Sequence, residues 1–319
     1  MKQVTIGIDI GGTNTKYGFV DREGNLLAGS SMPTVGYKEV EDYIDALSQA
    51  IEELRADIDV EMELMGIGVG APNANYYTGT IEHAPNLPWK GVIPLADLFM
   101  ERYDTGVFIT NDANAAAIGE MIYGGAKGMK NFAVITLGTG VGSGFVVNGD
   151  LVYGHDGFAG EFGHVTAIPD GRLCTCGKRG CVETYAAARG LVLTVQEEMA
   201  GSSQESELRH VLPEKLTPKD IYDAAIQGDT IAQKAFWETG RVLGKALSNL
   251  VAILSPEAIF FFGGVARAGD LILNPTREYM EKYVLTVFKN KVKLIPSHLP
   301  DSDAAILGAS ALAWKELDR

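Results

Sequence analysis

Residues 4–20 read VTIGIDIGGTNTKYGFV, an apolar run, a polar glycine-rich segment and a second apolar run. Short apolar runs are typical of buried strands, and the glycines between them predict a hairpin loop. A third run at residues 26–32 completes a predicted three-stranded meander. The same order recurs in residues 132–153, which begin FAVITLGTGVGSGFVV. A pattern that occurs twice in one chain predicts an architecture of two related halves.

Both glycine-rich hairpins offer free backbone N–H groups around one point. Where side chains are missing, successive N–H groups can cradle phosphate oxygens. Either hairpin alone is equally typical of a common turn, but two copies favour binding of the phosphates of ATP. The residues assigned to the nucleotide are Asp9, Gly11, Gly12, Thr13, Asn14 and Lys16 from the first hairpin and Gly138, Thr139 and Gly140 from the second. Asp9, at the end of its strand, is expected to hold Mg²⁺ through water.

Gly263 and Gly264 follow an apolar run at residues 258–262. Bare backbone at that point suits the approach of a base or a ribose. A plain strand-to-helix turn explains the two glycines nearly as well. They are therefore candidates for the nucleotide site, and the turn remains the alternative explanation.

Residues 164–183, HVTAIPDGRLCTCGKRGCVE, contain every cysteine of the chain. Cys174, Cys176 and Cys181 would supply three thiolates and His164 an imidazole, the usual set for a tetrahedral structural zinc. Buried or free thiols are the plainer alternative, but the spacing is too compact for three independent core residues. A disulfide is the other alternative, yet three is an odd number and nothing marks the chain as secreted.

Two carboxylates flank the predicted metal ligands. Glu161 lies three residues before His164, and Glu183 lies two residues after Cys181. A zinc ion that pins both ends of this loop would fix the two carboxylates near each other in a rigid polar site.

Asn111 and Asp112 stand where the apolar run at residues 106–110 gives way to an alanine-rich segment. Both residue types are favoured helix N-caps, and capping alone would explain the pair. The end of a strand in an α/β sheet is, however, where ligands bind. A carboxylate there is suited to accept a proton from a hydroxyl that attacks the terminal phosphate of ATP.

The remaining pattern alternates strands with amphipathic helices. Strands are predicted at residues 65–69 and 292–295, a loop from 70 to 95, and helices at residues 40–54, 112–123, 185–199, 230–254, from about 274, and at 304–317. No low-complexity segment or linker separates the two halves.

The composition excludes several classes of protein. The chain has 319 residues and a formal net charge of −14, which argues against a nucleic-acid partner, because phosphate binding needs a basic surface. The N-terminus has no apolar signal core, and no segment approaches the length that crosses a bilayer. A cytoplasmic protein is therefore expected.

The motifs together resemble those of the ROK family of repressors, open reading frames and kinases, in order and over essentially the whole chain. They are DIGGT at residue 9, NDAN at 111, LGTGVG at 137, GEFGH at 160 and CTCGKRGCVE at 174, the last being the most specific. The resemblance implies an α/β protein with two actin-like (ribonuclease H-like) ATPase domains, a cleft between them and a zinc knuckle. Residues 1–111 with 303–319 would form the small domain and residues 112–302 the large one. A homodimer is expected.

The resemblance also assigns roles to residues. Asp112 would be the base at the C6 hydroxyl of a sugar, and ATP with Mg²⁺ would supply the phosphate. The sugar would be bound by Asn86, Asn111, Asp112, Glu161, His164 and Glu183, with His164 also on the structural Zn²⁺. The chain departs from the pattern at Asn73, where relatives often have glycine, and at Ala188, where many have serine.

The expected activity is phosphorylation of an aldohexose at C6, with glucose as the leading substrate. An N-acetylhexosamine kinase, acting on N-acetylmannosamine or N-acetylglucosamine, and a fructokinase are the alternatives within the family. A transcriptional regulator of the family would need an N-terminal DNA-binding domain and is not expected, because the first strand begins at Val4.

Overall fold

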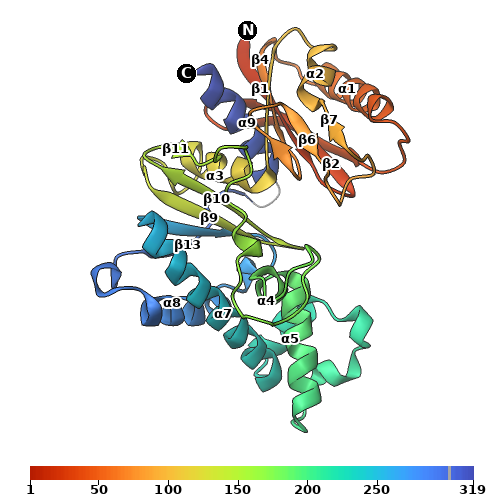
Figure 1. Ribbon diagram of the computed structural model, residues 1–319. Helices are drawn as coiled ribbons and strands as arrows, with labels where there is room; N and C mark the ends of the chain where they lie inside the picture. The colour runs from red at the N-terminus through yellow and green to blue at the C-terminus, as the bar shows by residue number, and fades with distance from the viewer. Residues whose placement is uncertain (301–302) are drawn as a thin grey trace. The chain divides into compact units, whose positions relative to one another are not determined.

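The computed structural model describes residues 1–300 and 303–319, and the chain forms two compact units. Unit 1 comprises Met1–Lys130, Gly144–Gly160 and His298–Arg319, and unit 2 comprises Asn131–Ser143 and Glu161–Ser297. The division into ATPase domains predicted from sequence remains a proposal, and its boundary at residue 302 lies outside the described residues. Figure 1 follows the chain from the first strand of unit 1 to the C-terminal helix of the same unit.

The predicted meander forms one side of the first sheet, whose strand order is β3-β2-β1-β4-β8. The strands are β1 (Lys2–Ile10), β2 (Asn14–Asp21), β3 (Leu26–Pro33), β4 (Met62–Gly70) and β8 (Gly106–Thr110). β2 pairs antiparallel with both β1 and β3, while β1, β4 and β8 run parallel. The carboxyl ends of three parallel strands therefore meet at one edge of this sheet.

Helices cover this sheet as the apolar spacing predicts. Helix α1 (Val40–Ala56) buries Tyr43, Ile44, Leu47 and Ile51, which recur at helical spacing. The C-terminal helix α9 (Ala304–Leu317) is buried along nearly its whole length and packs against β1 and β4. Its backbone comes close to the sheet at two glycines that face each other in adjacent strands, Gly7 and Gly68.

We expect Gly68→Ala to lower the free energy of unfolding by about 1–3 kcal/mol, the usual cost of overpacking a core. A methyl group on Gly68 would collide with the backbone carbonyl oxygen of Ala309, which cannot rotate away. Chemical denaturation measures the change. Gly201→Ala is the matched control, since a Cβ there meets no atom within 4 Å. Equal stability of the two variants would show that α9 does not need this close approach.

The stretch from residue 70 to 95, predicted to be a loop, contains short elements instead. β5 (Ala74–Asn75), β6 (Thr80–Glu82) and β7 (Val92–Ile93) form a small antiparallel sheet, followed by helix α2 (Leu95–Met100). The prediction missed these strands because two or three residues carry no detectable periodicity. Asn73, where relatives often have glycine, begins the segment with φ 52°, a left-handed conformation that asparagine tolerates.

The second sheet has the order β11-β10-β9-β12-β13. Its strands are β9 (Phe132–Leu137), β10 (Val141–Val147), β11 (Asp150–Leu151), β12 (Ala258–Phe262) and β13 (Lys293–Pro296). β12 lies parallel to both β9 and β13. The returning strand β10 begins at Val141, only four positions after β9 ends at Leu137, because the hairpin is tight.

The helices of unit 2 are α4 (Glu183–Ala186), α5 (Ala188–Gly201), α6 (Pro218–Ile226), α7 (Thr230–Leu254) and α8 (Asp270–Tyr283). The single helix predicted at residues 185–199 is wrong: the chain breaks at Ala187, whose φ and ψ of −75° and 167° are extended. The break brings Gly190 against the backbone of Thr184, where a Cβ would clash. Helix α6, missed from sequence, begins with a capping box between Thr217 and Asp220.

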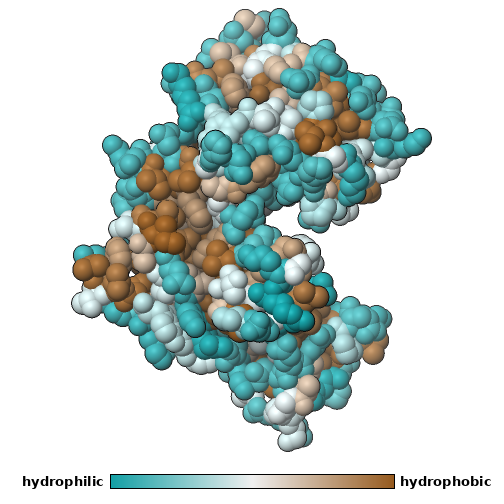
Figure 2. Space-filling view, viewed as in Figure 1, coloured by the Kyte–Doolittle hydropathy of each residue, from teal (hydrophilic) through white to brown (hydrophobic). Residues whose placement is uncertain are grey.

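Most of the surface seen in Figure 2 is hydrophilic, which agrees with the net charge of −14. Among the described residues, no helix combines the length and the apolar character that a membrane-spanning helix needs.

Candidate functional site

The first glycine-rich hairpin lies at the carboxyl end of β1. Asp9 and Lys16 are direct cross-strand partners, and the Gly11 N–H donates to the Asn14 carbonyl at 3.0 Å to close the turn. Gly12 packs on the segment that carries Asn86, because a Cβ on Gly12 would lie 2.8 Å from the Asn86 carbonyl oxygen. The predicted phosphate loop and one predicted sugar ligand are therefore in contact.

Asp9 and Asp112 face each other across Gly70 at the edge where the three parallel strands end. A Cβ on Gly70 would lie 3.6 Å from both the Asp9 Oδ1 atom and the Asp112 Cα atom. Burial, and then the charge of Asp112, raise the pKa of Asp9 to about 7, while the Lys16 ammonium lowers it. The protein atoms around Asp112 also raise its pKa by desolvation, a weaker effect than at Asp9 because the residue is exposed to solvent. Two carboxylates in this arrangement suit a bound cation or the uptake of a proton.

This raised pKa predicts a pH-dependent stability. The folded protein binds more protons at Asp9 than the unfolded chain does between pH 3.8 and about 7. The free energy of unfolding contributed by this group therefore falls as the pH rises through that window. We expect Asp9→Asn to be more stable than the unmodified protein in metal-free buffer, with a larger gain at pH 8 than at pH 5. Urea denaturation at both pH values checks this, with Asp59→Asn on the surface as control; an equal gain at both pH values would contradict it.

Asn111, and not Asp112, is the N-cap of helix α3 (Asp112–Ile122). The Asn111 side chain accepts a hydrogen bond from the Ala113 N–H at 3.0 Å. Asp112 is the first helical residue, and its Oδ1 accepts from the same N–H at 2.8 Å. The helix thus has its cap without Asp112, so capping alone does not account for the carboxylate.

The four predicted metal ligands meet in unit 2. One ligand atom from each of His164, Cys174, Cys176 and Cys181 lies within 4.8 Å of all the others. The Cys174 sulfur is 3.7 Å from the His164 Nδ1 atom, and the Cys176 and Cys181 sulfurs are 3.7 Å apart. A tetrahedral zinc with bonds of about 2.0–2.3 Å spaces its ligands at roughly these separations. The three cysteines are free, as zinc requires and the disulfide alternative does not allow.

Glycines shape the loop around these ligands. Gly177 has φ 87° and its N–H donates to the Cys174 carbonyl at 3.0 Å, while the Cys174 N–H donates to the Lys178 carbonyl at 2.8 Å. Gly180 has φ 77° and packs directly on the Ile168 carbonyl. The backbone therefore forms a preorganised knuckle that presents the sulfurs to one point.

The two flanking carboxylates also lie in unit 2. Glu161 precedes the short 3₁₀ turn Phe162–His164, so its position is set by the residue that supplies the imidazole. Glu183 is the first residue of α4, and its Oε2 atom accepts the N–H of Val141 at 3.0 Å. Its Oε1 atom is 3.8 Å from the Cys174 sulfur. Glu183 thus connects the knuckle with the second glycine-rich hairpin, a contact that the sequence did not predict.

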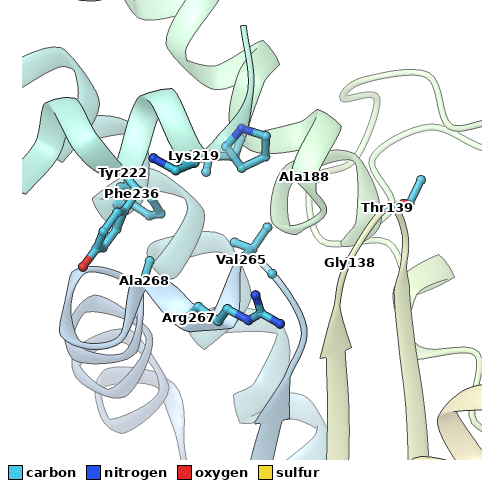
Figure 3. A pocket seen from close by; sticks show the side chains of 12 residues that line it. Gly138, Thr139, Ala188, Lys219, Tyr222, Phe236, Val265, Arg267 and Ala268 are labelled. Carbon is cyan, nitrogen blue, oxygen red and sulfur yellow. The ribbon is translucent and has the colours of Figure 1, made fainter. Parts of the chain in front are cut away.

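Unit 2 also contains a pocket of about 570 Å³ beside the second hairpin (Figure 3). Three of the residues that the sequence assigned to the nucleotide line this pocket, namely Gly138, Thr139 and Gly264. Gly263 has φ 103°, and a Cβ there would lie 2.6 Å from the Leu137 carbonyl oxygen. The turn after β12 therefore requires glycine at this position, as the alternative explanation from sequence stated.

Most of the pocket wall was not anticipated from sequence. Its other residues are Ala188, Leu191, Pro218, Lys219, Tyr222, Phe236, Val265, Arg267 and Ala268. They come from α5, α6, α7 and the turn after β12, and only Ala188 is a position of the family pattern. The capping box before α6 was the one signal that could have placed Lys219 and Tyr222 on a helix. A largely apolar pocket with a few polar groups beside a phosphate-type loop fits a nucleoside.

Comparisons with known proteins show which family has the same sequence motifs and the same fold. The model of the ROK family matches residues 5–316. A glucokinase from Streptomyces coelicolor is 36% identical over 315 residues, which cover 97% of each chain. The structure of a ROK family glucokinase from Streptomyces griseus in complex with glucose and AMPPNP has a TM-score of 0.81 and 33% identity, covering 98% of this chain and 99% of that one. A putative xylose repressor from Caldicellulosiruptor is 28% identical over 98% of this chain and 78% of its own length.

Proposed function

This chain belongs to the ROK family, and on that basis we propose that it is an ATP-dependent kinase of aldohexoses, with glucose as the preferred substrate. The observation that carries the proposal is the full-length similarity to glucokinases, at 36% identity over 97% of both chains. The ATP analogue and the glucose in the Streptomyces griseus relative are the ligands that such an enzyme would bind.

The nucleotide would use residues of both hairpins. The pocket beside Gly138 and Thr139 has the size and the largely apolar wall that a base and ribose need. The N–H groups of the hairpins would then face the phosphates, and Lys16 would add a positive charge. Asp9 would hold Mg²⁺, which neutralises phosphate charge when bound.

Asp112 would act as the base. Its carboxylate accepts the proton of the C6 hydroxyl as that oxygen bonds to the terminal phosphorus, and the bond from phosphorus to the bridging oxygen breaks to release ADP. Desolvation by the surrounding protein raises the pKa of Asp112. A carboxylate with a raised pKa takes up this proton more readily than an ordinary carboxylate does. The start of the helix does not depend on the charge of Asp112, because Asn111 is the cap.

The sugar hydroxyls would be bound by Asn86, Asn111, Glu161, His164 and Glu183. Carboxylates and amides suit this task because each can accept or donate more than one hydrogen bond. The His164 Nδ1 atom faces the sulfur cluster, which would leave Nε2 for a hydroxyl. Asn73 is not among these ligands, and its amide nitrogen already donates to the Glu82 carbonyl at 3.0 Å.

Initial rates with ATP and a panel of sugars test the proposal. Glucose, mannose, fructose, N-acetylglucosamine and N-acetylmannosamine are compared by kcat/KM under the same conditions. The highest value is expected with glucose. A higher value with fructose or with an N-acetylhexosamine would reassign the substrate, and no sugar-dependent turnover with any of them would refute a hexose kinase.

A further inference from the structure

The hairpin at residues 138–141 is held from outside by the segment that carries the metal ligands. The Val141 N–H donates to the Glu183 carboxylate at 3.0 Å, and the Ala188 N–H donates to the Gly138 carbonyl at 2.9 Å. Gly163, next to the His164 ligand, packs directly on the Val141 carbonyl, where any Cβ would collide. All of these residues belong to unit 2.

Glycine at position 140 makes the contact with the carboxylate possible. A Cβ there would lie 2.6 Å from the Glu183 Oε2 atom and meets nothing else closer than 3.6 Å. Gly138, in the same hairpin, has no atom within 4 Å of its Cβ position. At residue 140, therefore, the Glu183 carboxylate alone already leaves no room for a side chain.

We propose that Glu183 is a positioning residue for the nucleotide, in addition to the sugar contact assigned to it, and this inference rests on the proposed kinase function. Its Oε2 atom fixes the Val141 N–H and with it the curvature of the hairpin that receives the phosphates. A hydrogen bond to a charged acceptor is among the stronger ones in proteins. The knuckle holds Glu183 in turn through the chain, because the Cys181 ligand lies only two residues before it.

A residue that only binds sugar would leave nucleotide affinity untouched when no sugar is present. Loss of a residue that positions the hairpin would lower the nucleotide affinity even without sugar. In Glu183→Ala the Val141 N–H loses its acceptor and the hairpin becomes mobile, which should weaken nucleotide binding by about tenfold. In Glu183→Gln the amide oxygen can still accept the N–H, so most of the affinity should return.

Titration calorimetry of AMPPNP with Mg²⁺, without sugar, measures this for the intact chain and both variants. The zinc content of each variant, expected to be unchanged, shows that the effect does not arise from loss of metal. Hydrogen exchange at the Val141 amide provides a second readout: it should be slow in the unmodified chain and in Glu183→Gln, and fast in Glu183→Ala.

A double-mutant cycle with Gly140→Ala isolates the contact. The added methyl group would push the carboxylate away, so without nucleotide Gly140→Ala should speed exchange at the Val141 amide on its own but add little to the effect of Glu183→Ala. Additive effects would overturn the inference, as would AMPPNP affinity and Val141 exchange in Glu183→Ala equal to those of the unmodified chain. An unmodified chain that binds no AMPPNP would instead refute the kinase function.

Discussion

Asp112→Asn is expected to lower kcat by roughly 10²- to 10⁴-fold, the usual loss when a general base is removed. The amide has nearly the shape of the carboxylate but cannot take up the proton of the sugar hydroxyl. Because its oxygen can still accept the Ala113 N–H, the start of α3 should be unchanged. The KM values for sugar and ATP should change far less than kcat, since the lost interaction belongs to the transition state.

Two measurements separate this role from a structural one. Thermal unfolding should give nearly the same midpoint for Asp112→Asn and the unmodified chain. Asn111→Ala removes the cap side chain instead, and should cost about 1 kcal/mol of stability. If Asp112→Asn folds and turns over at close to the original rate, Asp112 is not the base.

Cys176→Ser is expected to abolish stoichiometric zinc binding and to weaken sugar binding by at least tenfold. Serine cannot supply the thiolate, and three ligands do not close a structural zinc site. Without the metal, the loop between Glu161 and Glu183 loses the ion that fixes both carboxylates. Elemental analysis measures the zinc, and calorimetry with glucose measures the affinity.

Thr175→Ser is the matched control, because Thr175 is an exposed neighbour that supplies no ligand. It should keep the metal and the sugar affinity of the unmodified chain. Full sugar affinity in a zinc-free Cys176→Ser protein would contradict a structural role for the metal.

The sequence predicted the elements that form continuous apolar or alanine-rich runs. Strands β1, β8, β9 and β12 and helices α3, α7 and α9 occur where the apolar patterns indicated. The cluster of His164 with the three cysteines is confirmed as well, because its ligands lie close together in sequence and a compact loop must bring them together.

What the sequence did not reveal depends on contacts that no periodicity records. The break at Ala187, which brings Gly190 against the backbone of Thr184, is a local example. The pocket wall joins the second hairpin, the turn after β12 and three helices, of which α6 has only nine residues and was missed. The bond from Val141 to Glu183 spans 42 positions, and neither motif on its own points to the other.

The central claim is that this chain transfers the terminal phosphate of ATP to the C6 hydroxyl of glucose. Phosphorus NMR of a reaction containing protein, glucose, Mg²⁺ and ATP tests it most directly, since it identifies both products. We predict equal amounts of ADP and glucose 6-phosphate, and no loss of ATP when glucose is omitted. Loss of ATP to free phosphate without any sugar phosphate, or no reaction at all, would contradict the account.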